Sequence, residues 1–313
     1  MNEFNAESTT NDVIQGIDLG GAQAVVTGAS SGLGVETARA LASAGAAVLM
    51  VARDAAKLET AVAQVKADQP DAQIGTALLD LADLDSVRAG AADILAQCPS
   101  INLLINNAGV MACPLDRTAQ GFEMQFGTNH LGHFLLTALL APALVVGAPA
   151  RVVNLSSGGH KFGAVNLEDP NYQQREYNKW QAYGEAKTAN ALFSVGLDAR
   201  GRSAGVRSFA VHPGVIMTEL SRHMQQEDYD LLTKGGAREM TLKSVEQGAA
   251  TSVWAATAPS LEGRGGIYLE DCQVAEPAIP GSEGGVESYA VDPDIADGLW
   301  QISEQLVGEI FSF

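Results

Sequence analysis

The stretch TGASSGLG, residues 27–34, decides the fold, because it joins a short apolar strand to a helix through a glycine-rich turn. An apolar strand pattern covers residues 22–27, and a helical pattern covers residues 33–44. Glycines at positions 28, 32 and 34 let the backbone turn tightly and approach a pyrophosphate closely. Free backbone N–H groups and the helix dipole would then bind the anion. In this strand–turn–helix context, the stretch predicts a dinucleotide-binding corner.

The alternation of strands and helices continues to the C-terminus. Strand patterns lie at residues 47–51, 74–79, 103–106, 151–155, 207–211 and 266–269, and helical patterns at 55–67, 84–97, 119–141, 183–200, 244–256 and 294–310. Repeated β-α units form parallel sheets. We therefore expect a single doubly wound α/β (Rossmann) domain over residues 16–313, with a parallel sheet of about seven strands flanked by helices. Residues 1–15 are expected to form a flexible tail, and residues 276–313 a C-terminal extension.

The charge is strongly acidic, because 37 Asp and Glu residues against 19 Lys and Arg give a formal net charge of −18. Such a surface repels nucleic acid and anionic lipid, so we expect no nucleic-acid partner. The N-terminus lacks the features of a signal or transit peptide. The most apolar run, residues 134–146, is too short to cross a bilayer and contains Pro142, which predicts a buried helix followed by a turn. We therefore expect a cytoplasmic protein without a membrane span.

The sequence offers no convincing metal site. The cysteines are widely spaced and contain no C-x-x-C pair, which favours buried free thiols over a disulfide framework or a zinc site: Cys98, Cys113 and Cys272. The histidines form no plausible ligand set and are expected to be structural: His130, His133, His160 and His212.

Five further motifs follow the glycine-rich turn. They are NNAG at residues 106–109, NHLGHFLL from Asn129, SS at 156–157, Tyr183-x-x-x-Lys187, and HPGVIMT at 212–218. In type and order they resemble the short-chain dehydrogenase/reductase family over nearly the whole chain. The NHLGHF block and the long segment before Tyr183 resemble its retinol-dehydrogenase-like and WW-domain oxidoreductase-like branches, although no WW module is present. The resemblance implies an NAD(P)-dependent oxidoreductase that transfers a hydride between nicotinamide C4 and a carbonyl or alcohol group.

Tyr183 and Lys187 lie four residues apart in a predicted helix, so both side chains point the same way. A phenol with a pKa of about 10 is a poor base at neutral pH. An ammonium about 4 Å away would favour the phenolate by roughly 4 kcal/mol at an effective dielectric constant of about 20, or about three pK units, while burial would oppose it. We therefore expect Tyr183 to be the general acid/base, with Lys187 lowering its pKa and, by the resemblance, binding the nicotinamide ribose.

The resemblance adds two residues to this catalytic group. It places Ser157 at the substrate oxygen, because the preceding Ser156 should point to the other face of the strand. Asn129 matches the family asparagine that holds a water near the lysine, which gives a reason for an otherwise mildly unfavourable residue inside a helix. We expect Ser157 to orient the substrate oxygen and Asn129 to help return the proton.

Arg53 ends the second strand, in VLMVARD, where an acidic residue binds the ribose 2′-hydroxyl of NAD and a basic residue accommodates the 2′-phosphate of NADP. NADP(H) is therefore favoured, with NAD(H) the alternative. Asp54 is expected to cap the next helix. The competing interpretation makes Arg53 an exposed strand-end residue. The turn and the resemblance together predict these cofactor contacts: Gly28, Ser30, Ser31, Gly32, Leu33, Gly34, Arg53, Asp80, Leu81, Asn107, Ala108, Gly109, Tyr183, Lys187, Pro213, Gly214 and Thr218.

Two segments depart from the regular alternation. Residues 217–243 are rich in charge and methionine and are expected to form a mobile substrate lid. Residues 158–181 contain an insertion with His160 and Trp180. A wall of the substrate pocket is one role for this insertion, and the sequence does not decide it.

The predicted substrate is a small carbonyl or alcohol, and the branch resemblance points to lipophilic aldehydes, ketones or secondary alcohols. Family members often form homo-oligomers through the helices that contain Asn129 and Tyr183. Two alternatives stay open. A sugar-nucleotide epimerase or dehydratase would share the turn and Y-x-x-x-K, although NNAG and the Asn129 helix speak against it. A non-catalytic NADP-binding regulatory protein would usually lack the tyrosine or the lysine, and both are present.

Overall fold

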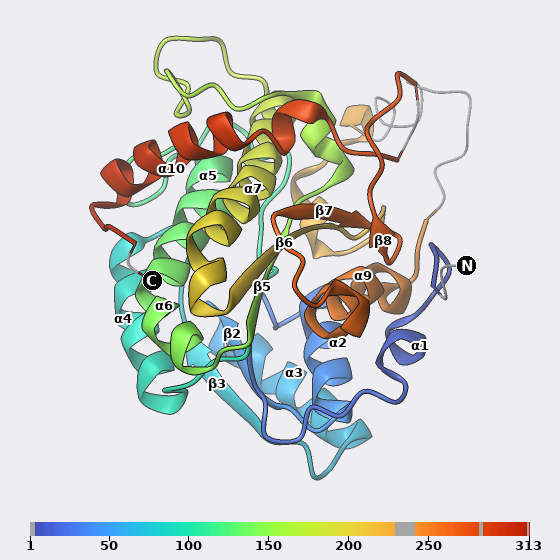
Figure 1. Cartoon of the computed structure of the whole chain (residues 1–313). Helices are drawn as coiled ribbons and strands as arrows, with labels where there is room; N and C mark the ends of the chain where they lie inside the picture. The colour runs from blue at the N-terminus through green and yellow to red at the C-terminus, as the bar shows by residue number, and fades with distance from the viewer. Residues whose placement is uncertain (1–3, 229–241, 282–283, 312) are drawn as a thin grey trace.

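The computed structural model describes residues 4–228, 242–281, 284–311 and 313, which build a sheet of eight strands with helices on both faces (Figure 1). The strand order is β3-β2-β1-β4-β5-β6-β7-β8, with β1 to β7 parallel and β8 antiparallel to β7. The order reverses between β1 and β4, and ligands bind beyond the carboxyl ends of the strands at such a reversal. The strands are β1 (Gln23–Thr27), β2 (Ala47–Ala52), β3 (Ile74–Leu78), β4 (Leu103–Asn106), β5 (Ala150–Leu155), β6 (Val206–His212), β7 (Ile267–Glu270) and β8 (Gln273–Val274).

Both faces of this sheet are covered, which confirms the predicted doubly wound fold. Val25 and Leu49 belong to the core beneath α4, α6, α7 and α10, whereas the adjacent Val26 and Met50 belong to the core beneath α1, α2, α3 and α9. Consecutive strand residues point to opposite faces, so these strands read as continuous apolar runs. The helices are α1 (Thr10–Ile14), α2 (Gly32–Ser43), α3 (Ala55–Asp68), α4 (Leu84–Gln97), α5 (Met124–Phe126), α6 (Gly132–Val146), α7 (Lys179–Gly201), α9 (Val245–Thr257) and α10 (Pro293–Val307).

The strands lie close to their predicted positions, and the two-residue β8 is additional. The N-terminal region differs from the prediction of a flexible tail over residues 1–15. Helix α1 begins there with a capping box, in which Thr9 and Asp12 satisfy each other's backbone N–H groups. Val13 and Ile14 are buried in the core against α9. Ordering this segment costs conformational entropy, and burial of the two side chains offsets that cost.

The central helical region also differs from its prediction of residues 119–141. It begins at Met124, widens into a π-helical turn at Gly127–Leu131, and continues as α6 to Val146. Pro142 lies inside α6, so the predicted turn at that residue is wrong. A proline removes one helical hydrogen bond, but burial of Leu140, Leu144 and their neighbours holds the helix together. By length and composition alone, residues 124–146 could also span a membrane. Of the 18-residue window within this segment that meets the test, 72% is buried inside the structure.

Helix α10 closes the C-terminal end of the fold by packing across α7 (Figure 1). The Trp300 ring centre lies 5.1 Å from that of Phe134 in α6, 5.9 Å from that of Phe193 in α7, and 4.6 Å from that of Phe311. The C-terminal extension therefore covers part of the two helices through which family members often associate. A homo-oligomer formed through those helices stays a prediction.

We expect Trp300→Ala to lower the free energy of unfolding by about 3–5 kcal/mol, because the truncation leaves a cavity among the buried aromatic rings. Urea denaturation at neutral pH measures the change. Gln301→Ala is the matched control on the same helix, because Gln301 is exposed, and its effect should stay within about 0.5 kcal/mol. Equal losses in the two variants would contradict the importance of this aromatic contact.

Candidate functional site

The glycine-rich turn lies where β1 and β4 part. Gly28 has a φ of +65°, and a Cβ there would lie 2.7 Å from the Cα of Ala108, so only glycine fits. A Cβ on Gly34 would collide with the carbonyl oxygen of Gly28. Ser31, the N-cap residue of α2, makes no side-chain capping bond to any described residue, which leaves the first N–H groups of α2 available to an anion. Three other predicted contacts are half-buried in the same turn: Ser30, Gly32 and Leu33.

A polar corner lies beside this turn, at the carboxyl ends of β2 and β3. The Arg53 guanidinium lies 3.9 Å from the Asp80 carboxylate, and both side chains are largely exposed. Ser86 accepts a hydrogen bond from the Asp80 N–H at 3.0 Å. Lys57, which the sequence analysis missed, adds a second cation and pairs with Glu219 at 3.0 Å. A hollow at this corner is lined by Arg53, Asp54, Leu78, Leu79, Asp80 and Ser86.

Two neighbours of this corner are engaged elsewhere. Asp54 caps α3 by accepting the N–H of Lys57 at 3.1 Å, which confirms the predicted cap. Leu81 is buried against α6, where a Cβ on Gly132 would lie 3.1 Å from its side chain. Any cofactor contact by Leu81 would therefore use its backbone.

The loop after β4 is fixed by its two asparagines. The Asn106 amide donates to Asn154 in β5 at 2.7 Å, and the Asn107 amide donates to the Thr27 carbonyl at 2.8 Å. These two side chains therefore hold the end of β4 to β5 and to the end of β1. Gly109 follows in the gap beyond, where a Cβ would lie 3.1 Å from Asn129 Oδ1 and 3.7 Å from Lys187 Nζ. NNAG, Asn129 and Lys187 therefore meet at one point.

Ser157 and Tyr183 come together at the carboxyl end of β5. Asn178 caps α7 by accepting two backbone N–H groups, and the helix then carries Tyr183 and Lys187 on a buried face. A Cβ on Gly159 would lie 2.7 Å from the Tyr183 ring and 3.3 Å from Ser157 Oγ, so the two side chains lie close together, and the Ser157 hydroxyl accepts the Gly159 N–H at 3.0 Å. Ser156 is buried and donates to the Lys187 carbonyl at 2.8 Å. This arrangement agrees with the choice of Ser157 as the substrate-facing serine.

The electrostatics of this pair differ from the sequence expectation. Burial raises the pKa of Tyr183 to about 12, with the hydrogen bond from Ser157 opposing the shift. Burial lowers the pKa of Lys187 to about 8. The Lys187 ammonium donates to the Leu155 carbonyl at 2.9 Å and lies 5.7 Å from the centre of the Tyr183 ring. In the protein alone, desolvation therefore outweighs the attraction that was expected to lower the Tyr183 pKa.

Asn129 lies in the π-helical turn before α6. Its amide is committed to Val110, accepting the N–H at 2.8 Å and donating to the carbonyl at 2.9 Å. The side chain therefore fixes the loop beside Lys187. The water that the resemblance implies at Asn129 stays a prediction, because these two bonds use only one N–H and one oxygen lone pair of the amide.

The segment after β6 returns across the turn. His212 accepts the N–H of Gly214 at 3.3 Å, and Gly214 has a φ of +92°, so the chain reverses just after Pro213. Thr218 then reaches the glycine-rich turn, where a Cβ on Gly32 would lie 3.4 Å from the Thr218 methyl carbon. Pro213, Gly214 and Thr218 thus border the predicted cofactor corner.

Only the ends of the predicted lid, residues 217–243, can be placed, because residues 229–241 lie outside the described part of the chain. At the first end, the Asp228 carboxylate accepts from Trp180 Nε1 at 3.0 Å and from Lys179 Nζ at 2.6 Å. Asp228 is only 4% exposed. This end is therefore anchored to the start of α7.

An apolar wall stands beside Tyr183. The rings of Trp180 and Tyr183 meet edge to face at 6.4 Å, and both pack with Ala112, Met111 and Met224. Trp180 is the contribution of the 158–181 insertion to this wall. The substrate side of Tyr183 is therefore lined by hydrocarbon and thioether groups.

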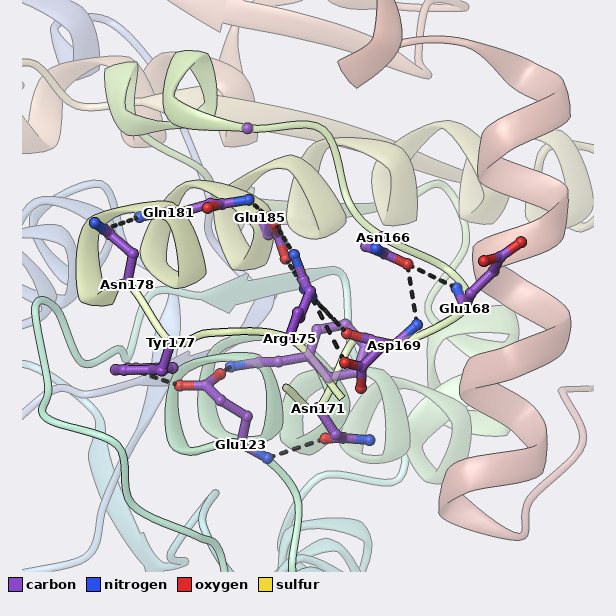
Figure 2. Close-up of polar contacts among 12 residues, drawn as sticks. Glu123, Asn166, Glu168, Asp169, Asn171, Arg175, Tyr177, Asn178, Gln181 and Glu185 are labelled. Carbon is purple, nitrogen blue, oxygen red and sulfur yellow. Dashed lines mark hydrogen bonds and ion pairs between the residues drawn. The ribbon is translucent and has the colours of Figure 1, made fainter. Parts of the chain in front are cut away.

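The rest of the insertion braces two helices (Figure 2). Arg175 bonds Glu185 of α7 through two nitrogens, at 2.6 and 2.5 Å. Asn171 accepts the Glu123 N–H at 2.9 Å, and Tyr177 donates to the Glu123 carboxylate at 3.2 Å. Glu123 in turn caps α5. The insertion therefore connects the helical segment of Asn129 to that of Tyr183, a role that the sequence did not reveal.

Comparisons with known proteins agree with this geometry. A family model described as short chain dehydrogenase matches residues 22–229. Retinol dehydrogenase 12 of Mus musculus is 42% identical over 93% of this chain and 88% of its own length. Short-chain dehydrogenase/reductase prx1 of Penicillium roqueforti is 40% identical over 90% of this chain and 84% of its own. The solved structure of an uncharacterised Mycobacterium paratuberculosis protein has a TM-score of 0.75 at 36% identity and covers 96% of this chain and 98% of that one.

His130, His133 and His160 are buried and His212 is half-buried, and all four favour the neutral form. Burial lowers the pKa of His130 to about 3 and the pKa values of His133 and His212 to about 4. Burial also lowers the pKa of His160. Among the described residues, no group of three or more His, Cys, Asp or Glu side chains is arranged to hold a metal ion.

These histidines should make the protein sensitive to acid. In the unfolded chain they titrate at about pH 6.5. Their stabilising effect is therefore complete above that pH and is lost as the pH falls towards about 4. Between these two pH values, each such histidine lowers the free energy of unfolding by about 1.4 kcal/mol for each unit by which the pH falls. The Gly158 and Gly214 N–H groups donate to His212 at 3.0 and 3.3 Å, and His212→Asn keeps an acceptor near them. This variant should remove the contribution of one histidine to the pH dependence of the free energy of unfolding.

Urea denaturation at about six pH values between roughly 4.5 and 8 measures how the free energy of unfolding changes with pH. The wild-type protein and His212→Asn should have similar stability at pH 8 and diverge in acid. An unchanged slope in the variant would show that His212 is not neutral in the folded protein.

Proposed function

The chain belongs to the short-chain dehydrogenase/reductase family, as its motifs predicted, and we propose that Tyr183 is the general acid/base of its reaction. The family makes the chain an oxidoreductase that acts on CH–OH or C=O groups with a nicotinamide cofactor. The observation that carries the proposal is the proximity of Ser157 and Tyr183 around Gly159, with Lys187 one turn further along α7 and 5.7 Å from the centre of the Tyr183 ring. All three lie beside the reversal between β1 and β4.

The residues at this reversal fit a dinucleotide. The free N–H groups of α2 and the absence of a Cβ at Gly28 and Gly34 provide a cradle for a pyrophosphate. Lys187 and Gly109 border the space beyond the loop after β4. When bound, the cofactor supplies or accepts the hydride at nicotinamide C4.

The side chains of this site divide the remaining work. Ser157 orients the substrate oxygen toward the Tyr183 hydroxyl. With a pKa of about 12, Tyr183 is protonated at neutral pH and is therefore prepared to donate to a carbonyl oxygen. Lys187, whose pKa is about 8, holds a proton close to neutrality and can exchange it. In carbonyl reduction Tyr183 donates its proton to the substrate oxygen, and in alcohol oxidation it accepts one.

The wall around Tyr183 supports a lipophilic substrate. It contains Ala112, Trp180, Met111 and Met224, and the indole N–H of Trp180 is directed to the Asp228 carboxylate at 3.0 Å. Relatives at 41–42% identity carry the name retinol dehydrogenase. We propose that this chain acts on lipophilic aldehydes or ketones, or on the corresponding alcohols.

The Tyr183→Phe variant should lose about 10²- to 10⁴-fold in kcat, because it lacks the proton that the reaction needs. NADPH affinity, measured by fluorescence titration, should change little. Turnover is followed as NADPH consumption across aliphatic, aromatic, retinoid and steroid carbonyls. Tyr172→Phe is the matched control, since the buried Tyr172 hydroxyl has no hydrogen-bond partner among the described residues. Near-normal turnover of Tyr183→Phe with NADPH still bound would reject the proposed role.

We further propose that NADP(H) is preferred to NAD(H). Arg53 is 62% exposed in its side chain, and its ionic neighbour among the described residues is Asp80, at 3.9 Å, so its guanidinium can turn to a 2′-phosphate. Lys57 lies one turn further along, in the same corner. The exposed Arg53 offers the fixed charge and donor fork that suit a ribose 2′-phosphate, whereas Lys57 is paired with Glu219 at 3.0 Å.

The Arg53→Ala variant should weaken NADPH binding by about 10- to 100-fold, the range for losing a charge-assisted hydrogen bond, and leave NADH binding nearly unchanged. Dissociation constants for both cofactors measure this selectivity without turnover. Lys66→Ala removes the same charge from the exposed far end of α3 and is the control. A wild-type preference for NADH, or equal weakening of both cofactors, would refute the assignment.

A further inference from the structure

His133 is a buried polar residue that the proposed chemistry does not use. It lies in the first turn of α6 and is 1% exposed. Its Nδ1 is 3.0 Å from the main-chain oxygen of Asn129, and its Nε2 is 2.9 Å from the hydroxyl of Thr27. One imidazole thus bridges the π-helical turn and the end of β1.

The directions of these hydrogen bonds follow from the partners. A carbonyl oxygen only accepts, so His133 Nδ1 carries the proton and donates to Asn129. His133 Nε2 then accepts from the Thr27 hydroxyl. That hydroxyl oxygen also accepts the N–H groups of Asn107 and Ala108, at 3.0 and 3.1 Å. A directed chain therefore runs from the loop after β4, through Thr27 and His133, to Asn129.

Asn129 is attached to the same loop a second time through its side chain, which clamps the N–H and carbonyl of Val110. The two attachments flank Gly109, where a Cβ would lie 3.1 Å from Asn129 Oδ1 and 3.7 Å from Lys187 Nζ. The position of the Asn129 turn therefore sets the space between this loop and the Lys187 ammonium.

The π-helical turn at Gly127–Leu131 explains why a side-chain donor is useful at position 133. In the π-helical turn, the Gly132 N–H bonds to the Gly127 carbonyl, five residues back. Such turns are less favourable than α-helical ones and often occur at functional sites. The side-chain donor of His133, four residues after Asn129, adds a bond that holds the widened turn.

We propose that His133 is a positioning residue, whose imidazole holds the Asn129 turn against the Thr27 junction so that Lys187 and Tyr183 are correctly placed. The inference rests on the proposed function of Tyr183. It adds to that function a residue that touches neither substrate nor cofactor.

Two substitutions separate the two hydrogen bonds of His133. His133→Asn keeps a donor near the position of Nδ1 and so preserves the bond to Asn129. His133→Gln keeps an acceptor near the position of Nε2 for Thr27 but lacks the donor to Asn129. If His133→Gln does not fold, His133→Met replaces it, because the Thr27 hydroxyl has a second acceptor in the Ile105 carbonyl at 3.3 Å.

The matched control is His130→Gln. His130 is equally buried, three residues earlier in the same segment, but its Nε2 bonds Ser303 of α10 at 2.7 Å, away from the site. Each variant is measured for kcat, for KM, for the pH dependence of kcat, for NADPH affinity by fluorescence, and for thermal stability.

We expect His133→Gln to lower kcat by about 10- to 100-fold, the effect of a small misplacement of reacting groups. Its kcat–pH profile should shift, while NADPH affinity changes little. His133→Asn should retain more activity, and His130→Gln should lose stability without a shifted profile.

An unchanged kcat and pH profile in His133→Gln would overturn the proposal. So would losses that follow thermal stability alike in the His133 and His130 variants. Failure of the proposed function is a separate result, because it would appear as a Tyr183→Phe variant that retains turnover.

Discussion

The site depends on the contact between the carboxyl ends of β1 and β4. The Thr27 hydroxyl accepts two N–H groups of the loop after β4, and the Asn107 amide donates back to the Thr27 carbonyl. These bonds hold the end of β1 and the loop after β4 so close together that Gly28 has no room for a Cβ beside Ala108. The phosphate-binding turn opens on one side of this junction. On the other side lie the Asn129 turn and the Lys187 ammonium, so one contact sets both halves of the site.

The motifs that lie at strand ends could be predicted because their roles are local. A glycine without room for a Cβ, a helix cap at Asp54 and an amide that pairs neighbouring strands all depend on residues close in the chain or in the sheet. The continuation of α6 through Pro142 was not predicted, because it depends on burial by α4 and other distant elements. The use of the Asn129 amide by Val110 was missed for the same reason.

The 158–181 insertion shows this limit most clearly. The sequence left its role undecided, and Arg175 and Asn171 bond residues 10 and 48 positions away. Burial raises the pKa of Glu123, while the N–H groups of Gln125 and Phe126 and the Tyr177 hydroxyl oppose that shift. A carboxyl group in such a place needs several donors, and the insertion supplies one of them. The chain thus uses added polar residues to fix a helix that carries part of the site.

Burial also decides which protonation states the site can use. Desolvation disfavours charge on both members of the pair, raising the pKa of Tyr183 and lowering that of Lys187, so burial favours the neutral phenol and the neutral amine. The sequence spacing could indicate attraction between a phenolate and an ammonium, but it could not weigh this attraction against the loss of water. That loss is imposed by Trp180 and Ala112, which pack against Tyr183, and by Met224 from the start of the lid segment. The apolar wall beside Tyr183 is therefore also what raises the Tyr183 pKa, so the lipophilic selectivity and the proton donation that we propose would depend on the same contacts.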